Sequence, residues 1–426
     1  MRVFKFGGAS VNSADAVRNM AHIVQSHLGK EPLVVVVSAM GKTTNLLEKL
    51  VPGVSSETSQ LRQQLESYHL DIAKGLIADD QCLVAKVRSL LQQFDDTVAS
   101  LNPVADDYSY NYDQVVSYGE LLSTTIIAHY LNSYGISTLW ADARQLIITD
   151  DHYREGRVDW EATRRACSRH LGAEVLQKQG CQVVLTQGFI AANNHGTTTL
   201  GREGSDYSAA ILANCLGAES MTIWKDVPGF LNADPKFFHN TVKIRQIPYN
   251  EAIELAYYGA SVIHPKTVKP LQNMGIPLYV NSFVTPASEG SAIGNYHAIS
   301  PETPLYIFRN DQILLSILPR DYSFIAEDNL QVIFGLLNEL GVRVNLMQNS
   351  ALSFSICIDN NPQLVGRLVE RLKSMFRVRY NDNLQLITIR YYTQQVIDSI
   401  VADRPVLLEQ RSRTTEQLVV PAKAGE

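Results

Sequence analysis

Short, fully apolar runs that alternate with amphipathic stretches are the strongest constraint that this sequence places on its fold. Leu33–Val37 reads Leu-Val-Val-Val-Val, which is the length of a strand and has no polar face. Such runs are typical of parallel sheets that helices cover on both faces. Five further strand candidates lie in the first two-thirds of the chain: Val3–Phe6, Ser137–Trp140, Gln182–Thr186, Met221–Trp224 and Pro277–Asn281.

A helix between the first two runs sets the order of the elements. Apolar residues recur at helical spacing from Val17 to Leu28, Asn12 or Ser13 can begin the helix, and Gly29 can end it. The strand–helix–strand order predicts a doubly wound α/β domain, which binds ligands at the carboxyl ends of its strands. Small, charged or hydroxyl residues stand at four such ends: Lys5 to Gly8, Ser38 to Gly41, Thr186 to Gly188, and Lys225 with Asp226.

A second type of fold is expected after Phe283–Pro304, where Pro, Ser, Gly and Asn collect. The elements that follow have the order β-α-β-β-α-β, the ferredoxin-like motif. They are the strand Ile313–Leu318, a helix near Asn329 to Gly341, the strands Val342–Met347 and Ser353–Asp359, the helix Gln363–Phe376 and the strand Arg377–Tyr380.

An internal repeat extends this region. Val344 to Ser350 resembles Val406 to Ser412, and Leu386–Arg390 resembles Ile313–Leu318. We therefore predict a shortened second copy of the ferredoxin-like unit. The predicted domains are residues 1–296, 305–383 and 384–422, and the tail from Pro421 to Glu426 is expected to be disordered.

Composition excludes several classes of protein. A formal net charge of -6 argues against a broad surface for nucleic acid or anionic lipid. No apolar run is long enough to span a bilayer, and the N-terminus has no signal-peptide pattern. The five cysteines have neither metal-site spacing nor a disulfide pattern. We therefore expect a cytoplasmic protein without nucleic-acid or membrane partners.

The segment from Thr197 to Asp206, which leads into a helix, is the strongest chemical signal. Small residues before a helix N-terminus expose backbone N–H groups that suit an anion, and Arg202 can hold a carboxylate with two hydrogen bonds. A plain loop in which Asp206 is only a helix N-terminal acid is the alternative.

Two further residues have both a chemical and a structural interpretation. Lys5, at the end of the first strand beside two glycines, can neutralise a phosphoryl group during transfer, or it can be an edge lysine before a turn. Glu120 can bind an ammonium group, or it can stabilise the start of the helix Leu121–Leu131.

Other motifs argue against familiar nucleotide sites. Gly41-Lys42-Thr43-Thr44 resembles the end of a Walker A loop, but Val36 stands where that loop needs glycine. The spaced glycines of a dinucleotide site are also missing from the sequence. His264 is expected to be structural, and Asp150 to His152 to form a solvated loop.

In their order along the chain, these motifs resemble the aspartate kinases, members of the amino-acid kinase family, over essentially the whole length. The matching segments are Lys5 to Ser10, Ser38 to Asn45, Ser117 to Glu120, Thr186 to Phe189, Thr198 to Asp206, Lys225 to Gly229, Asp234-Pro235 and Tyr258 to Pro265.

The resemblance implies transfer of the ATP γ-phosphate to the β-carboxylate of L-aspartate, the first step toward lysine, threonine and methionine. By position it makes Lys5 and Asp206 catalytic, with Asp206 holding Lys5. It assigns the α-carboxylate to Arg202, the α-ammonium to Glu120, the β-carboxylate to Thr44 and Ser38, phosphates to Gly7, Gly8, Ser10 and Ser205, and the nucleotide pocket to Lys225, Asp226 and Lys236. Mg²⁺ is expected on ATP phosphate oxygens, so no protein metal ligand is predicted.

The sequence also departs from the family pattern. Ala9 stands for a usual threonine, Glu203 for a common glycine, Lys236 for a frequent arginine and Leu231 for a frequent aromatic residue. We expect these changes to alter ATP affinity without loss of activity, and Glu203 to point outward.

The C-terminal repeats resemble ACT domains, the effector-binding modules of the family, which implies a homodimer and a possible amino-acid effector. Asn345 and Ala351 stand where lysine-sensitive members have acids. We therefore expect weak inhibition by lysine or none.

Two other functions remain open. A related kinase of glutamate, acetylglutamate or UMP is disfavoured by the ACT-like tail and by Ser117 to Glu120. A non-catalytic amino-acid sensor is disfavoured because Lys5, Arg202 and Asp206 are all present.

Overall fold

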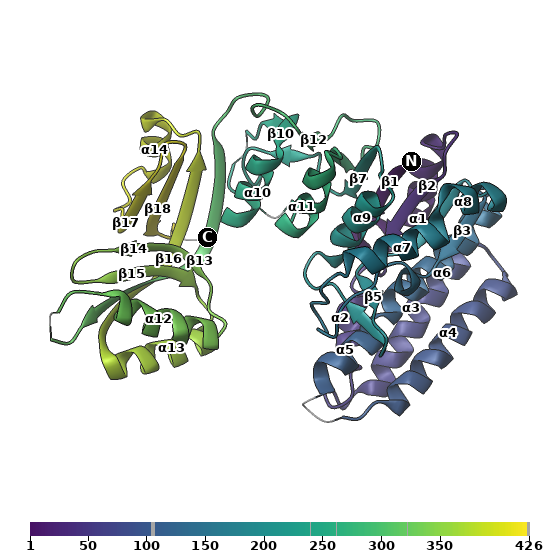
Figure 1. Cartoon of the computed structure of the whole chain (residues 1–426), viewed down its shortest axis with the longest axis horizontal. Coiled ribbons are helices and arrows are strands. Elements are labelled where there is room, and N and C mark those ends of the chain that lie inside the picture. The colour runs from purple at the N-terminus through teal and green to yellow at the C-terminus, as the bar shows by residue number, and fades with distance from the viewer. Residues whose placement is uncertain (104–106, 239, 261, 322, 424–426) are drawn as a thin grey trace. The chain divides into compact units, whose positions relative to one another are not determined.

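The protein, seen in a computed structural model, consists of two compact units (Figure 1). The structure describes residues 1–103, 107–238, 240–260, 262–321 and 323–423, so the last three residues of the tail lie outside the described residues. Unit 1 comprises Met1–Phe230, Lys243–Ile253 and Val262–Pro301, and unit 2 comprises Leu231–Val242, Glu254–Ser261 and Glu302–Glu426. The domain boundaries expected from the sequence stay predictions.

Unit 1 is built on an eight-stranded sheet with the order β10-β12-β11-β7-β1-β2-β4-β3. All neighbouring strands are parallel except β11 and β12. This mostly parallel sheet confirms the predicted α/β class and all six predicted strands, whereas β10 and β12 were missed. The strands are β1 (Arg2–Phe6), β2 (Leu33–Val37), β3 (Thr138–Ala141), β4 (Val183–Gln187), β7 (Ser220–Lys225), β10 (Gln246–Pro248), β11 (Leu278–Ser282) and β12 (Ser291–Gly294).

The remaining short strands lie outside this sheet. The hairpin of β5 (Ile190–Ala192) and β6 (Thr197–Thr199) leads toward the site, and β8 (Phe230–Leu231) and β9 (Lys243–Ile244) are two residues each.

The helices are η1 (Gly8–Val11), α1 (Ala14–Ser26), α2 (Thr43–Glu48), α3 (Thr58–Leu76), α4 (Gln81–Ser100), α5 (Tyr108–Val116), α6 (Tyr118–Ser133), η3 (Ala143–Gln145), α7 (Trp160–Leu171), α8 (Ala173–Gln179), α9 (Gly204–Cys215), α10 (Tyr249–Tyr258) and α11 (Pro265–Met274). Ser13 caps α1 as predicted, because its hydroxyl accepts the N–H of Ala16 at 3.2 Å. The predicted end at Gly29 is wrong: the helix ends at Ser26, where the N–H of His27 bonds to the carbonyl of Val24.

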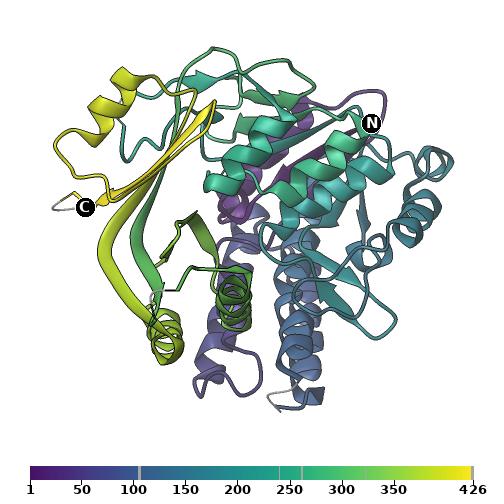
Figure 2. The ribbon, with the colours of Figure 1, turned by 60° about the vertical axis from the view of Figure 1, so that its left-hand side comes forward.

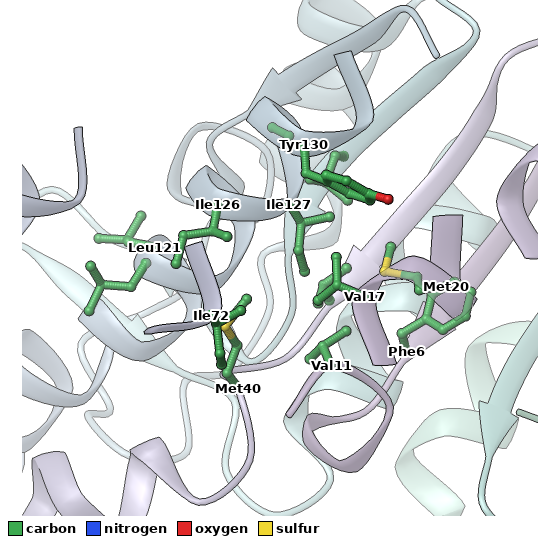
Figure 3. Packing of buried hydrophobic residues seen from close by; sticks show 14 of the residues in the cluster. Phe6, Val11, Val17, Met20, Met40, Ile72, Leu121, Ile126, Ile127 and Tyr130 are labelled. Atoms are coloured by element: carbon green, nitrogen blue, oxygen red, sulfur yellow. The ribbon is translucent and has the colours of Figure 1, made fainter. Parts of the chain in front are cut away.

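The core of unit 1 lies between the sheet and helices α1, α3 and α6. Figure 3 shows Phe6 of β1, Val17 and Met20 of α1, and Ile127 of α6 in this interior, and all four are fully buried. Every residue of β2 is buried, as the continuous apolar run predicts for a central strand. This packing holds the carboxyl ends of β1 and β2 in fixed positions.

Unit 2 contains a six-stranded sheet with the order β14-β15-β13-β16-β18-β17, in which all neighbours are antiparallel. Figure 2 shows β13 and β16 as two long, curved strands side by side. The elements are β13 (Leu305–Pro319), α12 (Glu327–Glu339), β14 (Val344–Asn349), β15 (Phe354–Asp359), α13 (Pro362–Met375), β16 (Phe376–Arg390), α14 (Gln394–Val401), β17 (Leu408–Arg411) and β18 (Thr415–Pro421).

The two long strands each serve both predicted repeats. The first repeat, which has the predicted ferredoxin-like order, uses residues 312–319 of β13 and 376–381 of β16 with α12, β14, β15 and α13. The second repeat uses residues 384–390 of β16 with α14, β17 and β18. Residues 305–309 of β13 pair with residues 386–390 and give the second repeat a strand from far upstream.

The second repeat is shortened, as the sequence predicts. Within the described residues it has one helix, α14, whose Ile397 and Val401 pack on the sheet. On the same face, the rings of Phe237 and Phe238 lie 5.1 Å and 5.8 Å from that of Phe308. Aromatic side chains from a turn thus cover part of the area that a second helix covers in a full repeat.

Three smaller expectations can be compared with the structure. All five cysteines are free thiols. His264 caps α11 through its Nδ1, which accepts the N–H of Lys266 at 3.2 Å, and this fits the expected structural role. Among the described residues, no helix combines the length and apolarity needed to cross a bilayer. The cytoplasmic location stays a prediction.

Candidate active site

A cavity of about 670 Å³ opens where the carboxyl ends of β1 and β2 meet the N-termini of α6 and α9. Eight of the predicted site residues line it: Lys5, Gly8, Ser38, Thr44, Glu120, Arg202, Ser205 and Asp206. Residues from four separate stretches of the chain therefore converge, as the rule for parallel sheets predicts.

At the floor of the cavity, one carboxylate bridges two ammonium groups. Asp206 is fully buried, and its Oδ1 lies 2.5 Å from Nζ of Lys5 and its Oδ2 3.3 Å from Nζ of Lys225. Burial disfavours the charge, but the two lysines outweigh burial and hold the pKa of Asp206 below its usual value. The predicted contact between Asp206 and Lys5 is thus present, and Lys225 joins it.

The turn after β1 brings backbone close to Lys5. A Cβ on Gly8 would lie 2.8 Å from the carbonyl oxygens of both Ala39 and Gly41, so only glycine fits there. Ser10 is buried, and its hydroxyl donates to the carbonyl of Trp224 at 3.4 Å. Gly7 and Ser10 are not among the cavity-lining residues, so their phosphate contacts stay predictions.

Glu120, in the first turn of α6, is the second buried carboxylate of the cavity. Its Oε1 accepts the N–H of Ala39 at 3.2 Å, and its Oε2 is buried without a hydrogen-bond partner. Burial raises the pKa of Glu120 to about 8. A buried carboxylate with an unused oxygen fits a cationic ligand, because an ammonium group would restore both the charge balance and the missing hydrogen bond.

The loop before α9 presents the anion-binding groups. Arg202 is exposed in the cavity, and Ser205 and Asp206 belong to the first turn of α9, where helix N–H groups have no partner within the helix. Glu203 adopts a left-handed φ of 55°, a conformation that glycine adopts without strain. This explains why a glycine suits that position. Glu203 is exposed, but it lines the cavity as well.

The carboxyl end of β2 and the start of α2 form another wall. Ser38 and Thr44 both line the cavity. The carbonyl of Ser38 accepts the hydroxyl of Ser123 at 2.8 Å, which ties the end of β2 to α6. Both side chains stand where a small carboxylate ligand can reach a hydroxyl donor.

The predicted nucleotide residues fall into two groups. Lys225 is partly buried at the end of β7, where its Nζ also donates to the carbonyl of Val262 at 2.5 Å, and Asp226 beside it is exposed. Lys236 belongs to unit 2, so its part in a nucleotide pocket stays a prediction.

Sequence reasoning missed Arg154, Tyr112 and Asp113. Arg154 and Tyr112 line the cavity. The carboxylate of Asp113 accepts the backbone N–H of Arg154 at 2.8 Å and so fixes the Arg154 loop. Burial raises the pKa of Asp113 to about 6. No motif surrounds these residues.

The sequence of this chain is similar to those of one family of enzymes. Residues 1–282 match the amino acid kinase family. The lysine-sensitive aspartokinase 3 of Escherichia coli (strain K12) is 31% identical over 400 residues, which are 91% of this chain and 86% of that protein. The chloroplastic aspartokinase 1 of Arabidopsis thaliana is 30% identical over 383 residues, 87% of this chain and 65% of that protein.

Solved structures agree with these relatives. The structure of E. coli aspartokinase III in complex with lysine and aspartate superposes with a TM-score of 0.83 at 28% identity and covers 99% of this chain and 96% of that one.

Proposed function

The chain belongs to the amino acid kinase family, among the aspartokinases, and from this premise we propose that it transfers the γ-phosphate of ATP to the β-carboxylate of L-aspartate. The products are ADP and 4-phospho-L-aspartate. E. coli aspartokinase III has been solved with aspartate and ADP, and that structure superposes on this chain with a TM-score of 0.81.

The observation that carries the proposal is the unpartnered Oε2 of Glu120 in the same cavity as Lys5 and Arg202. L-Aspartate has one ammonium group and two carboxylates. The cavity offers Glu120 to the ammonium and Arg202 to the α-carboxylate, and hydroxyl groups to the β-carboxylate. A uridine nucleotide has no ammonium group to pair with Glu120, which disfavours a UMP kinase.

The chemistry needs little from the protein beyond position and charge. A β-carboxylate oxygen forms a bond to the γ-phosphorus while the bond from phosphorus to the ADP oxygen breaks, and no proton is transferred. No general base is therefore required. Lys5 neutralises the charge on the transferred phosphoryl group, and Asp206 orients Lys5.

The remaining substrate contacts follow the same logic. Arg202 holds the α-carboxylate and Glu120 the α-ammonium, while Thr44 and Ser38 steady the β-carboxylate. Gly7, Gly8, Ser10 and Ser205 supply donors to phosphates, and Lys225 and Asp226 line the nucleotide site. A nucleotide contact of Lys236 stays a prediction from the sequence.

Mg²⁺ is part of the proposal as a companion of ATP. Within the described ranges no three His, Cys, Asp or Glu residues cluster as a metal site, and Asp206 is already paired with two lysines. We propose that phosphate oxygens mainly hold the ion, where it would neutralise phosphate charge.

Unit 2 is proposed to be a pair of ACT domains through which two chains associate. β14 is an edge strand of the sheet, with Met347 52% exposed, and Phe334 of α12 is 41% exposed. An unpaired edge beside exposed apolar side chains suits a second copy of the chain. Light scattering should give twice the chain mass of 47.4 kDa, and a monomer at micromolar concentration would contradict the dimer.

Lysine is proposed to inhibit weakly or not at all. Asn345 is neutral, and its amide is already used: Oδ1 accepts from Arg309 at 2.9 Å, and Nδ2 donates to Gln312 and Asp359 at 2.8 Å each. Ala351 adds no charge. Half-maximal inhibition by micromolar lysine would contradict this proposal.

Acyl-phosphate formation from Mg-ATP, trapped with hydroxylamine, tests the activity directly. Aspartate, glutamate and acetylglutamate are compared as acceptors. A signal with aspartate alone is expected. If a folded protein binds aspartate but gives no signal, the sensor function replaces the kinase.

A further inference from the structure

A second guanidinium group faces the cavity, supplied by the loop between η3 and α7. Arg154 lines the same cavity as Arg202, and both side chains are exposed to it. The backbone of Arg154 has a left-handed φ of 69°, which is unfavourable for a residue with a Cβ. Such strain persists only where the surrounding contacts enforce it, as they do at many binding sites.

Aromatic rings of α5 hold the Arg154 side chain in place. Its Cζ lies 4.6 Å from the ring centroid of Tyr112 and 5.4 Å from that of Tyr108. The hydroxyl of Tyr108 donates to Glu48 at 3.4 Å, which fixes the outer ring. A stacked guanidinium keeps the N–H groups at its edge available for an anion.

The positive charge of Arg154 acts on Asp113 and on the two tyrosines, but its guanidinium has no ion-pair partner within the described part of the chain. None of the ion pairs among the described residues includes Arg154. The acids around it are Asp113, which accepts its backbone N–H, and the cavity-lining Glu155, Glu203 and Glu120. An exposed, oriented and unpaired guanidinium in a ligand cavity is a binding group for a carboxylate or a phosphate.

The Arg154 loop is tied directly to the Arg202 loop. Asp113 accepts the N–H groups of Arg154 at 2.8 Å and of Thr199 at 2.9 Å, and the hydroxyl of Thr199 at 2.7 Å. The N–H of Gly156 donates to the carbonyl of Thr199 at 2.8 Å. A Cβ on Gly201 would lie 3.2 Å from the carbonyl oxygen of Arg154. The two arginines therefore stand on neighbouring loops.

We propose that Arg154 binds the α-carboxylate of L-aspartate together with Arg202, so that two guanidinium groups hold this part of the substrate. The inference rests on the proposed function. The phosphate groups are assigned to another pair of cations, Lys5 and Lys225, which Asp206 links by two ion pairs. The loop of Arg154 instead contacts the Arg202 loop, where the α-carboxylate is assigned.

Kinetics of Arg154→Ala test the proposal, with Arg157→Ala as the matched control. Arg157 is an exposed arginine of the same loop and is not among the cavity-lining residues. The Arg154 variant should raise the KM for aspartate about tenfold, with kcat and the KM for ATP within about twofold of wild type, because the α-carboxylate does not react. Arg157→Ala should match wild type, and Arg154→Lys should fall between.

A substrate without the α-carboxylate charge separates binding from loop structure. For L-aspartate α-amide, kcat/KM should be the same in wild type and in Arg154→Ala, because the group that Arg154 binds is missing. Equal losses with aspartate and with the amide would overturn the proposal and make Arg154 structural. An unchanged KM for aspartate would overturn it too. If wild type itself does not phosphorylate aspartate, the proposed function fails instead.

Discussion

The first turns of α9 and α6 place two buried carboxylates in one cavity, and the two carboxylates are treated in opposite ways. Asp206 lies between two lysines of the chain, which keep the pKa of its carboxyl low. Glu120 has one backbone N–H and an unpartnered oxygen, and its pKa rises to about 8. The chain thus supplies the cationic partners of Asp206 at α9 itself, whereas Glu120 at α6 receives its cationic partner from the substrate.

Removing Lys5, a cationic partner of Asp206, should have the largest effect on activity. Lys5→Met removes the ammonium group that neutralises the phosphoryl group, so kcat for hydroxamate formation should fall by about a thousandfold or more. Lys5→Arg keeps a positive charge beside Asp206 but moves it. A folded Lys5→Arg enzyme of low activity would therefore show that the exact position of the charge matters, and not only the stability of the fold. Lys42→Met, an exposed lysine outside this cavity, is the control. A Lys5→Met enzyme within tenfold of wild type would remove Lys5 from the mechanism.

Removing the charge of Glu120 should change binding more than chemistry. Glu120→Gln leaves the substrate ammonium without a counter-charge, so the KM for aspartate should rise by about thirtyfold to a hundredfold while kcat changes little. Glu155→Gln also alters a cavity acid, but an exposed one, and should stay near wild type. Equal KM values for the two variants would mean that Glu120 does not bind the ammonium.

The raised pKa predicts how binding depends on pH. Glu120 binds the ammonium only when ionised, so the KM for aspartate should fall about twentyfold between pH 6.5 and pH 8.5 as Glu120 passes its pKa of about 8. Glu120→Gln should remove this dependence. A flat profile in wild type would show that Glu120 is ionised throughout this range.

Thermal stability should show the smallest effect. Above the ordinary pKa of 4.5, the unfolded chain has released the Glu120 proton while the folded chain retains it, so this group lowers the free energy of unfolding as pH rises toward about 8. Without ligand, the Tm of Glu120→Gln relative to wild type should therefore increase by about 5 °C from pH 5 to pH 8. Asp206 does not interfere, because its lowered pKa leaves it ionised throughout this range. A constant Tm difference would argue against a protonated Glu120.

The sequence predicts the central sheet well because its strands carry their own signal. The run Leu33–Val37 became a central strand with the predicted bounds. β10 and β12 were missed because three or four residues are too few to show a pattern, and their pairing depends on distant segments. The same holds for residues 305–309, whose partners lie about eighty residues further along the chain.

The candidate site was predictable only where a motif and a strand end coincide. Lys5, Arg202 and Asp206 lie in such motifs, and the structure brings them together. Arg154 became part of the cavity through Asp113 and Thr199, two residues that no local pattern links to it. The environment of Glu120 was equally hidden, since burial is a property of the packed fold and not of the segment.

Because both repeats use β13 and β16, the first repeat is an insertion within the sequence of the second. The inserted repeat begins after residue 309 and ends before residue 386. Arg309 and Leu386 are direct cross-strand neighbours. Because the entry and exit strands are antiparallel neighbours, a two-residue turn such as Asn-Gly can join them as a hairpin. The first repeat can thus be deleted as one continuous segment. The second repeat cannot be expressed as a single continuous segment, because one of its strands, residues 305–309, precedes the inserted repeat.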